Sequence, residues 1–420
     1  MIQFIVVHSP FEASDLVSDR LKAEIEFLQK FPSIVYTGNV SSANEAGNII
    51  RNYSGKPGGI IIFVATGGTE NYIKTISDSV DYPILLVANS QKNSFAAALE
   101  SFAFLKTNHA IDLLYSDDST ELAERINQFI IVCNAIYKIN HATVGIIGEP
   151  SDWLLTSKDY KNFGKFGTTL KNFAITELTD KIENADKHDS DKTASQIKET
   201  YKTSSVPEQA VLDSAKVYTA SKELIEENNL ASITIKCFDL LQNNYTACMA
   251  MSLLNDEGII SGCEGDLEAT FSMMLGYYIT NSPCWMANPA HIDKQKNTLT
   301  LAHCTIASKM FSDLSQAELT THMESGLSVA NMGPLRLSDV TIFRMGSSLS
   351  VLTAITGKIV ETNMKNELHC RTQAKIKLDG PIDKWTKNTP GNHQVIVYGD
   401  IKNELELFCK FSGVEFNYII

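Results

Sequence analysis

Short apolar runs alternate with amphipathic stretches over the first 140 residues of the chain. Four of the runs are rich in β-branched side chains and lead into Gly, Asn or Ser: FIVVHS, SIVYTG, GIIIFVATGG and YPILLVANS. The stretches 14–30, 95–106 and 122–138 carry their apolar residues at helical spacing. Strands and helices that alternate in this way predict a parallel sheet with helices on both faces.

A second unit of the same kind begins at residues 141–153, HATVGIIGEPSDW, where another strand leads into a loop. The polar stretch 180–203 is typical of a solvated helix or an insertion, and residues 214–228 again show helical periodicity. We expect a strand in ASITIKCFDLL, and TACMAMSLLND is a further apolar run.

The pattern changes near residue 287, where strand signals separated by turns replace the alternation. The runs NTLTLAHCTI, DVTIFRM, AKIKLD and HQVIVYGD predict strands, and only 404–411 is clearly helical. The sequence therefore predicts an α/β protein with two parallel-sheet domains, residues 1–141 and 142–286, and a β-rich domain, residues 287–420. A chain of 420 residues is also too long for one ordinary core.

Composition narrows the class of protein. No stretch approaches 18 uninterrupted apolar residues, so we expect no membrane span. The start, MIQFIVVHSP, lacks the basic region of a signal peptide, so we expect a cytoplasmic protein. A net charge of −13, with no basic stripe, argues against a nucleic-acid partner. The eight cysteines are widely spread without a C-x-x-C pair, which favours buried reduced thiols.

The densest group of chemically capable residues is SGCEGDLEATFSMM, residues 261–274. Two carboxylates flank a glycine where a strand leads into a helix. Asp266 fits the N-cap of that helix or a role in ligand binding. Glu264 is harder to explain structurally, because its neighbours Cys263 and Leu267 are apolar. A carboxylate in such surroundings needs a partner, and a metal ion is one candidate.

Histidines in apolar strand contexts add to this group. His303 lies in LTLAHCTIA, His322 and Glu324 lie in TTHMESG, and His393 lies in GNHQVIVYG. Glu and His ligands with open positions suit Mn²⁺, Fe²⁺ or Co²⁺, and also Zn²⁺. The glycine-rich piece ATGGTE, residues 65–70, has an anion-binding geometry in principle but matches no nucleotide motif.

At Glu264 the chain begins to resemble the L-fucose/L-arabinose isomerase family, and in particular its L-fucose isomerase-like branch. The stretch CEGDLEATFSMMLGYYITNSPCWMANPAHID resembles the metal-ligand region of L-fucose isomerase. GNHQVIVYGDIKNELELFCKFSGVE resembles the C-terminal segment of that family. LAHCTIA, THMESG, LHCRTQ, VATGGTE, NSFAAALES and GEPSDWLLTS extend the likeness over nearly the whole chain in order.

The resemblance implies two Rossmann-like domains followed by a barrel-like β domain, in a homo-oligomer, a trimer or hexamer. It implies a Mn²⁺-dependent aldose–ketose isomerase that acts on a small sugar of the fucose or arabinose class through an ene-diol. The metal-binding Glu and His of the fucose isomerases fall on Glu264 and His393. A further histidine of the arabinose isomerases falls on His303. The family Asp falls on Asn288, which can coordinate a cation but cannot act as a base.

This substitution leaves three functions open: an isomerase with a rearranged base pair, a related epimerase or aldolase, and a non-catalytic sugar-binding or regulatory relative. For an isomerase we expect Glu264 as ligand and base, with Asp266 or Glu324 as its partner. The remaining expected substrate contacts are His322, Glu324, Arg371, Gly68, Thr69 and Glu70. Trp153 and Trp285 follow family landmarks, but for large aromatics packing is the simpler expectation.

Overall fold

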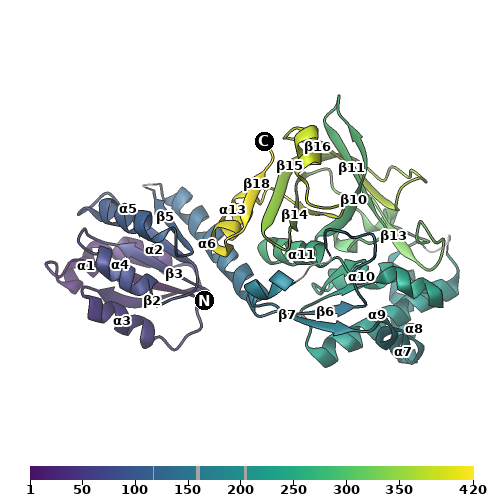
Figure 1. The fold of residues 1–420 in the computed structure, drawn as a ribbon, viewed down its shortest axis with the longest axis horizontal. Coiled ribbons are helices and arrows are strands. Elements are labelled where there is room, and N and C mark those ends of the chain that lie inside the picture. Colours follow the sequence, from purple (N-terminus) through teal and green to yellow (C-terminus); the bar gives the residue numbers. More distant parts are fainter. Residues whose placement is uncertain (117, 158–160, 203–205) are drawn as a thin grey trace. The chain divides into compact units, whose positions relative to one another are not determined.

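The computed structural model describes residues 1–116, 118–157, 161–202 and 206–420 (Figure 1). The chain forms two compact units, residues 1–137 with 403–413, and residues 138–402 with 414–420. The second unit contains both the second parallel sheet and the β-rich part. The expected boundary between residues 286 and 287 stays a prediction. Among the described residues, no helix is long and apolar enough to cross a membrane.

The first unit is built on a five-stranded parallel sheet with strand order β2-β1-β3-β4-β5. Every residue of β1, β3 and β4 is buried, as expected for a sheet that is covered on both faces. The strands are β1 (Ile2–Val7), β2 (Ile34–Val40), β3 (Gly59–Val64), β4 (Ile84–Ala88) and β5 (Ile111–Tyr115).

Helices connect these strands, as the alternating pattern predicts. They are α1 (Ser14–Arg20), α2 (Lys22–Gln29), α3 (Ala43–Arg51), α4 (Glu70–Ser77), α5 (Ser94–Leu105) and α6 (Ser119–Asn140). The expected single helix over 14–30 is divided at Leu21, a fully buried residue with a non-helical backbone. Helix α13 (Lys402–Ser412) returns to this unit from the far end of the chain.

The second unit begins with a four-stranded parallel sheet of order β7-β6-β8-β9. Its strands are β6 (Thr143–Ile147), β7 (Thr169–Phe173), β8 (Ser232–Ile235) and β9 (Ile260–Cys263). Its helices are α7 (Ile175–Glu183), α8 (Lys187–Thr200), α9 (Glu208–Asn228), α10 (Cys248–Asp256) and α11 (Leu267–Thr280), with a 3-10 helix at Lys161–Phe166. The polar stretch 180–203 falls on the end of α7 and on α8, and its last residue, Thr203, lies outside the described residues.

One strand prediction in this unit was wrong. The run ASITIKCFDLL forms β8 only as far as Ile235, and Cys237–Asn243 is a 3-10 helix. The pairs Ile147↔Ile235 and Ile235↔Cys263 are the last of their ladders, so no neighbouring strand remains to pair with residue 237. This common end is the carboxyl edge of the sheet, where open α/β sheets bind ligands.

A closed antiparallel barrel follows (Figure 1), where the sequence pattern predicted a β-rich domain and the resemblance implied a barrel. Its six strands pair in the order β14-β17-β10-β11-β16-β15, and β15 pairs back with β14. They are β10 (Trp285–Asp293), β11 (Thr298–His303), β14 (Asp339–Gly346), β15 (Val351–Thr362), β16 (Thr372–Leu378) and β17 (Gln394–Tyr398).

Smaller elements complete the barrel region. The strand β18 (Glu415–Tyr418) adds to β15 in parallel, and β12 (Glu318–Thr320) pairs with β13 (Ala330–Met332). The helix α12 (Ile382–Asn388) and the 3-10 turns Ser308–Met310 and Leu314–Gln316 were not expected from the sequence. One apolar core runs through the barrel and includes Trp285, which is fully buried, as the packing interpretation predicted.

Candidate metal centre and sugar pocket

The turn between β9 and α11 projects Glu264 beyond the edge of the parallel sheet. Glu264 and Gly265 both have left-handed backbone angles, with φ of 62° and 71°. A Cβ on Gly265 would lie 2.6 Å from the carbonyl oxygen of Glu149, so only glycine fits there. For Glu264 this conformation is uncommon and costs energy, which makes it a marker of functional sites. The backbone N–H of Ser151 donates to the Glu264 carbonyl oxygen at 2.8 Å and holds the turn.

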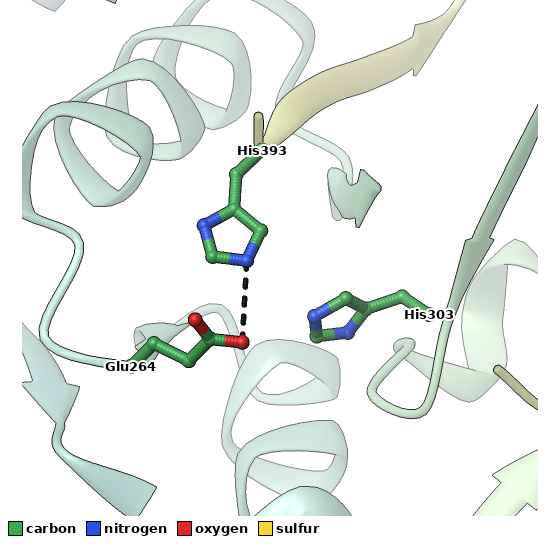
Figure 2. Close-up of side chains that lie close together, drawn as sticks. All are labelled: Glu264, His303 and His393. Atoms are coloured by element: carbon green, nitrogen blue, oxygen red, sulfur yellow. Dashed lines mark ion pairs between the residues drawn. The ribbon is translucent and has the colours of Figure 1, made fainter. Parts of the chain in front are cut away.

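Three buried side chains converge at this turn (Figure 2). Glu264, His303 and His393 each offer one ligand atom, and these atoms all lie within 4.8 Å of one another. His303 is the last residue of β11, and His393 directly precedes β17. The Nε2 atom of His393 lies 3.5 Å from Oε1 of Glu264. The barrel and the parallel sheet therefore both contribute to one centre.

The orientation of His393 is set by a second carboxylate. Its Nδ1–H donates to Oδ2 of Asp266 at 2.8 Å. Burial by itself would lower the pKa of His393, but the contacts with Asp266 and Glu264 outweigh it and raise the pKa to about 9. Nε2 has no hydrogen-bond partner in the described part of the chain, although the ring is fully buried. At this pKa Nε2 carries a proton at neutral pH, so a cation at the centre would bind there in place of that proton.

His303 is held differently. Its Nδ1 accepts the backbone N–H of Thr305 at 3.1 Å, which leaves Nε2 as the nitrogen not engaged by the backbone. Burial and the neighbouring His393 lower the pKa of His303 to about 4, so the ring is neutral at neutral pH. In this arrangement Nε2 carries the ring proton. Binding a cation there requires the proton to leave or to move to the other nitrogen.

Glu264 is ionised at neutral pH. Burial would raise the pKa of its carboxyl group, but the adjacent His393 ring, the hydrogen bond from Trp153 and the nearby His303 lower it below its usual value. The Trp153 indole N–H donates to Oε2 at 2.6 Å. The packing interpretation of Trp153 was therefore wrong. The side chain is 53% exposed and contacts the Glu264 carboxylate.

These donors fit a divalent cation. One carboxylate and two imidazoles are ligands that Mn²⁺, Fe²⁺, Co²⁺ and Zn²⁺ accept. The contact between a carboxylate and the far nitrogen of His393 is the usual support of a metal-binding histidine. Nε2 of His393 is buried beside Glu264 without a hydrogen-bond partner among the described residues, which is a second argument for the same conclusion. His303 fits once its ring proton has moved.

An open pocket of about 490 Å³ adjoins the centre. It lies at the carboxyl edge of the parallel sheet, because Trp153 follows β6, Phe238 follows β8 and Glu264 follows β9. Asn288, on β10, lines the same pocket, and its Oδ1 accepts the Asn392 side-chain N–H at 3.2 Å. The lining residues are Trp153, Phe238, Glu264, Asn288, Pro289, Glu324 and Asn392.

The two expected partners of Glu264 occupy different environments. Glu324 is exposed and lines the pocket. Asp266 is fully buried, and its Oδ1 accepts the backbone N–H of Ala269 at 3.0 Å. The N-cap interpretation of Asp266 is thus confirmed. Both of its oxygens are engaged, and it is not among the lining residues.

The other expected substrate contacts are dispersed. His322 lies in the turn after β12, not in a strand, with its ring centroid 5.5 Å from that of Phe238. Arg371 donates from Nε to the Thr321 carbonyl oxygen at 2.7 Å. The structure thus places His322 against a wall of the pocket, and Arg371, which directly precedes β16, against the loop that carries His322.

Gly68, Thr69 and Glu70 lie in the first unit, where a separate pocket of about 400 Å³ forms at the carboxyl ends of β1, β3 and β4. Gly68 lines that pocket, whereas Thr69 is buried and donates to the Thr66 carbonyl oxygen at 3.1 Å. Their role in binding a sugar stays a prediction.

Sequence reasoning missed Arg344 and Ser157. Arg344 is fully buried on β14, in the run DVTIFRM that identified the strand. A charged side chain within an apolar strand was the available signal, because buried arginines need partners. Ser157 is a buried residue of the loop after β6 and carried no comparable signal.

The chain is similar to known sugar isomerases. Residues 161–279 match the L-arabinose isomerase central domain family. The chain is 22% identical over 365 residues to a sulfoquinovose isomerase of Alkalicoccus urumqiensis, covering 79% of this chain and 81% of the relative. A sulfoquinovose isomerase of Clostridium sp. (strain MSTE9) is 22% identical, with 67% of this chain and 65% of the relative covered. A sulfoquinovose isomerase of Priestia megaterium is 22% identical, with 76% of this chain and 71% of the relative covered.

These similarities support an enzyme of the sugar isomerase type. They do not single out the L-fucose isomerase branch, which the sequence motifs had suggested. The chain is similar to proteins of both the arabinose and the sulfoquinovose isomerase groups.

Proposed function

We propose that this protein is an aldose–ketose isomerase that moves a proton between C1 and C2 of a small sugar through an ene-diol. One observation carries the proposal: the ionised carboxylate of Glu264 opens into a pocket and meets His303 and His393 at a single buried centre. The similarity to sugar isomerases supports the same reaction.

Glu264, His303 and His393 would hold a divalent cation, which we propose to be Mn²⁺, with Asn288 as a neutral fourth oxygen ligand. A cation bound there would polarise the sugar carbonyl and stabilise negative charge on its oxygen. The protein's own residues contribute the rest. Asp266 keeps the Nδ1–H of His393 pointed away from the pocket.

Proton transfer in this proposal is the task of the two carboxylates that face the pocket. Glu264 is ionised and takes the proton from C2, because a base must be deprotonated and within hydrogen-bonding reach of the carbon. Glu324, the second carboxyl group of the pocket, exchanges protons with the sugar oxygens at C1 and C2. Asp266 is excluded from this role by its buried hydrogen bonds with other groups.

We propose a neutral aldose of the fucose or arabinose class as the substrate. Trp153 and Phe238 supply apolar walls, and the amides of Asn288 and Asn392 can hydrogen-bond sugar hydroxyls. Sulfoquinovose, named for the relatives, carries a sulfonate that favours Arg or Lys partners. Among the described residues that line the pocket, the only charged groups are two carboxylates.

The proposal can be tested by NMR in D₂O on a panel of free aldoses, with sulfoquinovose as the anionic comparison, in the presence of Mn²⁺ or EDTA. We expect loss of the C2 proton signal and ketose formation with Mn²⁺ only, and neither in Glu264→Gln. Glu257→Gln is a matched control, since Glu257 is also held by side-chain hydrogen bonds, from Tyr218 and Lys222, but lies outside the pocket.

The outcomes separate the functions that the sequence left open. Exchange without ketose would indicate an epimerase, and cleavage products would indicate an aldolase. Sugar binding without exchange, with Mn²⁺ bound, would leave a binding or regulatory protein. Turnover of sulfoquinovose alone would contradict the neutral substrate but retain the reaction. Light scattering on the same samples would test the proposed trimer or hexamer.

A further inference from the structure

Arg344 is the largest charged side chain that is fully buried beside the proposed metal centre, and no step of the reaction uses it. Its guanidinium group binds the Asp266 carboxylate through both Nη atoms. Nη1 donates to Oδ2 at 3.0 Å, and Nη2 donates to Oδ1 at 3.2 Å. Two parallel contacts of this kind restrict the orientation of a carboxylate more than a single contact would.

The same guanidinium reaches the histidine that Asp266 supports. Nη1 also donates to the backbone carbonyl oxygen of His393 at 2.8 Å, and Nη2 donates to Ser157 Oγ at 3.0 Å. Ser157 in turn donates to Oδ1 of Asp266 at 2.9 Å. Arg344 therefore contacts the backbone of His393 and, through Asp266, its ring.

The local backbone makes room for this arrangement. A Cβ on Gly391 would lie 2.5 Å from Nε of Arg344, so the guanidinium passes directly over a glycine two residues before His393. Glu268 lies on the other side, with Oε2 at 3.5 Å from Nη2. A buried arginine surrounded in this way is a poor source of stability, because desolvating the charges offsets much of their attraction. A planar guanidinium is suited instead to hold a carboxylate in one orientation.

We propose that Arg344 is a positioning residue for the metal centre. It fixes the carboxylate of Asp266, which holds the ring of His393 with Nε2 directed toward Glu264. The inference rests on the proposed function in one respect, namely that His393 binds a cation through Nε2. Arg344 is not among the residues that line the pocket, and it contacts the centre only at the His393 backbone carbonyl oxygen, so its effect passes through Asp266 and His393.

Two variants test the role. Arg344→Lys keeps a positive charge, but a single ammonium cannot hold both oxygens of Asp266 and the His393 carbonyl oxygen together. Asp266→Asn keeps the shape and remains a good N-cap for α11, but weakens the contact with the imidazole. For each we expect Mn²⁺ affinity to fall about 10- to 100-fold, the usual cost of losing a support of a metal-binding histidine.

Ser272→Ala is the matched control. Ser272 also joins α11 to β14, because its hydroxyl accepts the Met345 backbone N–H at 2.9 Å, but it does not contact Asp266 or His393. We expect this variant to lose stability while Mn²⁺ affinity stays within about twofold of the original protein. The comparison separates a general loosening of the contact between α11 and β14 from a specific effect on His393.

The measurement is Mn²⁺ binding by electron paramagnetic resonance on the full-length chain after EDTA treatment, with thermal unfolding in EDTA as the stability readout. Affinity lost in Arg344→Lys and Asp266→Asn, but not in Ser272→Ala, supports the inference. Equal affinities in all three overturn it, while Mn²⁺ binding by the original protein stands. If Arg344→Lys does not fold, Asp266→Asn decides. Absence of Mn²⁺ binding in the original protein overturns the metal proposal and this inference together.

Discussion

Oδ2 of Asp266 lies 2.8 Å from Nδ1 of His393, although the two residues are 127 positions apart in the chain. Asp266 is the N-cap of α11, which follows the parallel sheet, whereas His393 directly precedes β17 of the barrel. This contact joins the two layers of the second unit at the centre. Because it occupies Nδ1, it determines which nitrogen of His393 faces Glu264.

Restoring a carboxylate at Asn288 tests whether this position belongs to the metal shell. In Asn288→Asp we expect tighter Mn²⁺ binding, by about 1 kcal/mol or more, because a charged oxygen attracts a cation more strongly than an amide oxygen does. Asn288→Ala should weaken binding. Isothermal titration calorimetry on the EDTA-treated protein measures both. Unchanged affinity in both variants would show that Asn288 lies outside the shell.

Trp153 can be tested without removing the aromatic wall. Trp153→Phe deletes only the N–H that donates to Oε2 of Glu264 at 2.6 Å. Hydrogen bonds to charged groups contribute about 1.5–3 kcal/mol, so we expect kcat to fall about tenfold or more. Because this hydrogen bond lowers the pKa of Glu264, the acidic limb of the pH–kcat profile should also shift upward. Phe238→Leu, which alters the wall but not Glu264, should chiefly raise KM.

The free energy of unfolding should depend on pH through Glu268. Burial raises the pKa of this carboxyl group to about 7, although the Arg344 guanidinium opposes the shift. The folded protein then holds the proton more tightly than the unfolded chain, whose value is 4.5. Stability from this group therefore falls as pH rises from 4.5 to about 7 and is constant above that range.

Glu268→Gln removes this dependence. The free energy of unfolding of the variant, compared with that of the original protein, should be higher at pH 8 than at pH 5. The expected change is up to roughly 3 kcal/mol, the equivalent of the pKa difference. Urea unfolding at the two pH values measures the gain. An equal loss of stability at both values would contradict the prediction and show an ionised Glu268 paired with Arg344.

Cation binding should stabilise the folded chain. At a Mn²⁺ concentration of 100 times Kd the gain is about 2.7 kcal/mol, which appears as a higher Tm that EDTA reverses. We expect most of this gain to disappear in His303→Ala and in His393→Gln, since each removes a ligand from the centre. His322→Ala is the control, because His322 lies beside Phe238 and outside the group of three ligand residues. The same Mn²⁺ response in all variants would place the cation elsewhere.

The sequence by itself determined most of the fold. Runs such as 59–64 and 84–88 are apolar at every position. This pattern is typical of a strand whose sheet is covered on both faces. The predictions were weakest where an apolar run continues past the end of its sheet. Residues 237–241 continue the apolar run of β8, but no neighbouring strand extends far enough to pair with them.

The chemistry of the centre was partly determined in the same way. Glu264 and Asp266 stand out in the sequence, because two carboxylates beside a glycine at a strand-to-helix junction need hydrogen-bonding or charged partners. Their separate roles could not be read from the sequence. Only the tertiary structure shows that Asp266 faces inward to Arg344 and His393 while Glu264 faces the pocket.

Tertiary structure alone decided the supporting contacts. Trp153 and Glu264 are separated by 111 residues, and Arg344 and Asp266 by 78. No local pattern can pair such residues, since a hydrogen bond depends on the packing of two layers and leaves no periodic trace in either segment. Hydrophobic periodicity reports which face of an element is buried, and this determined the strands and helices. Which polar groups meet across the buried faces is a property of the folded chain.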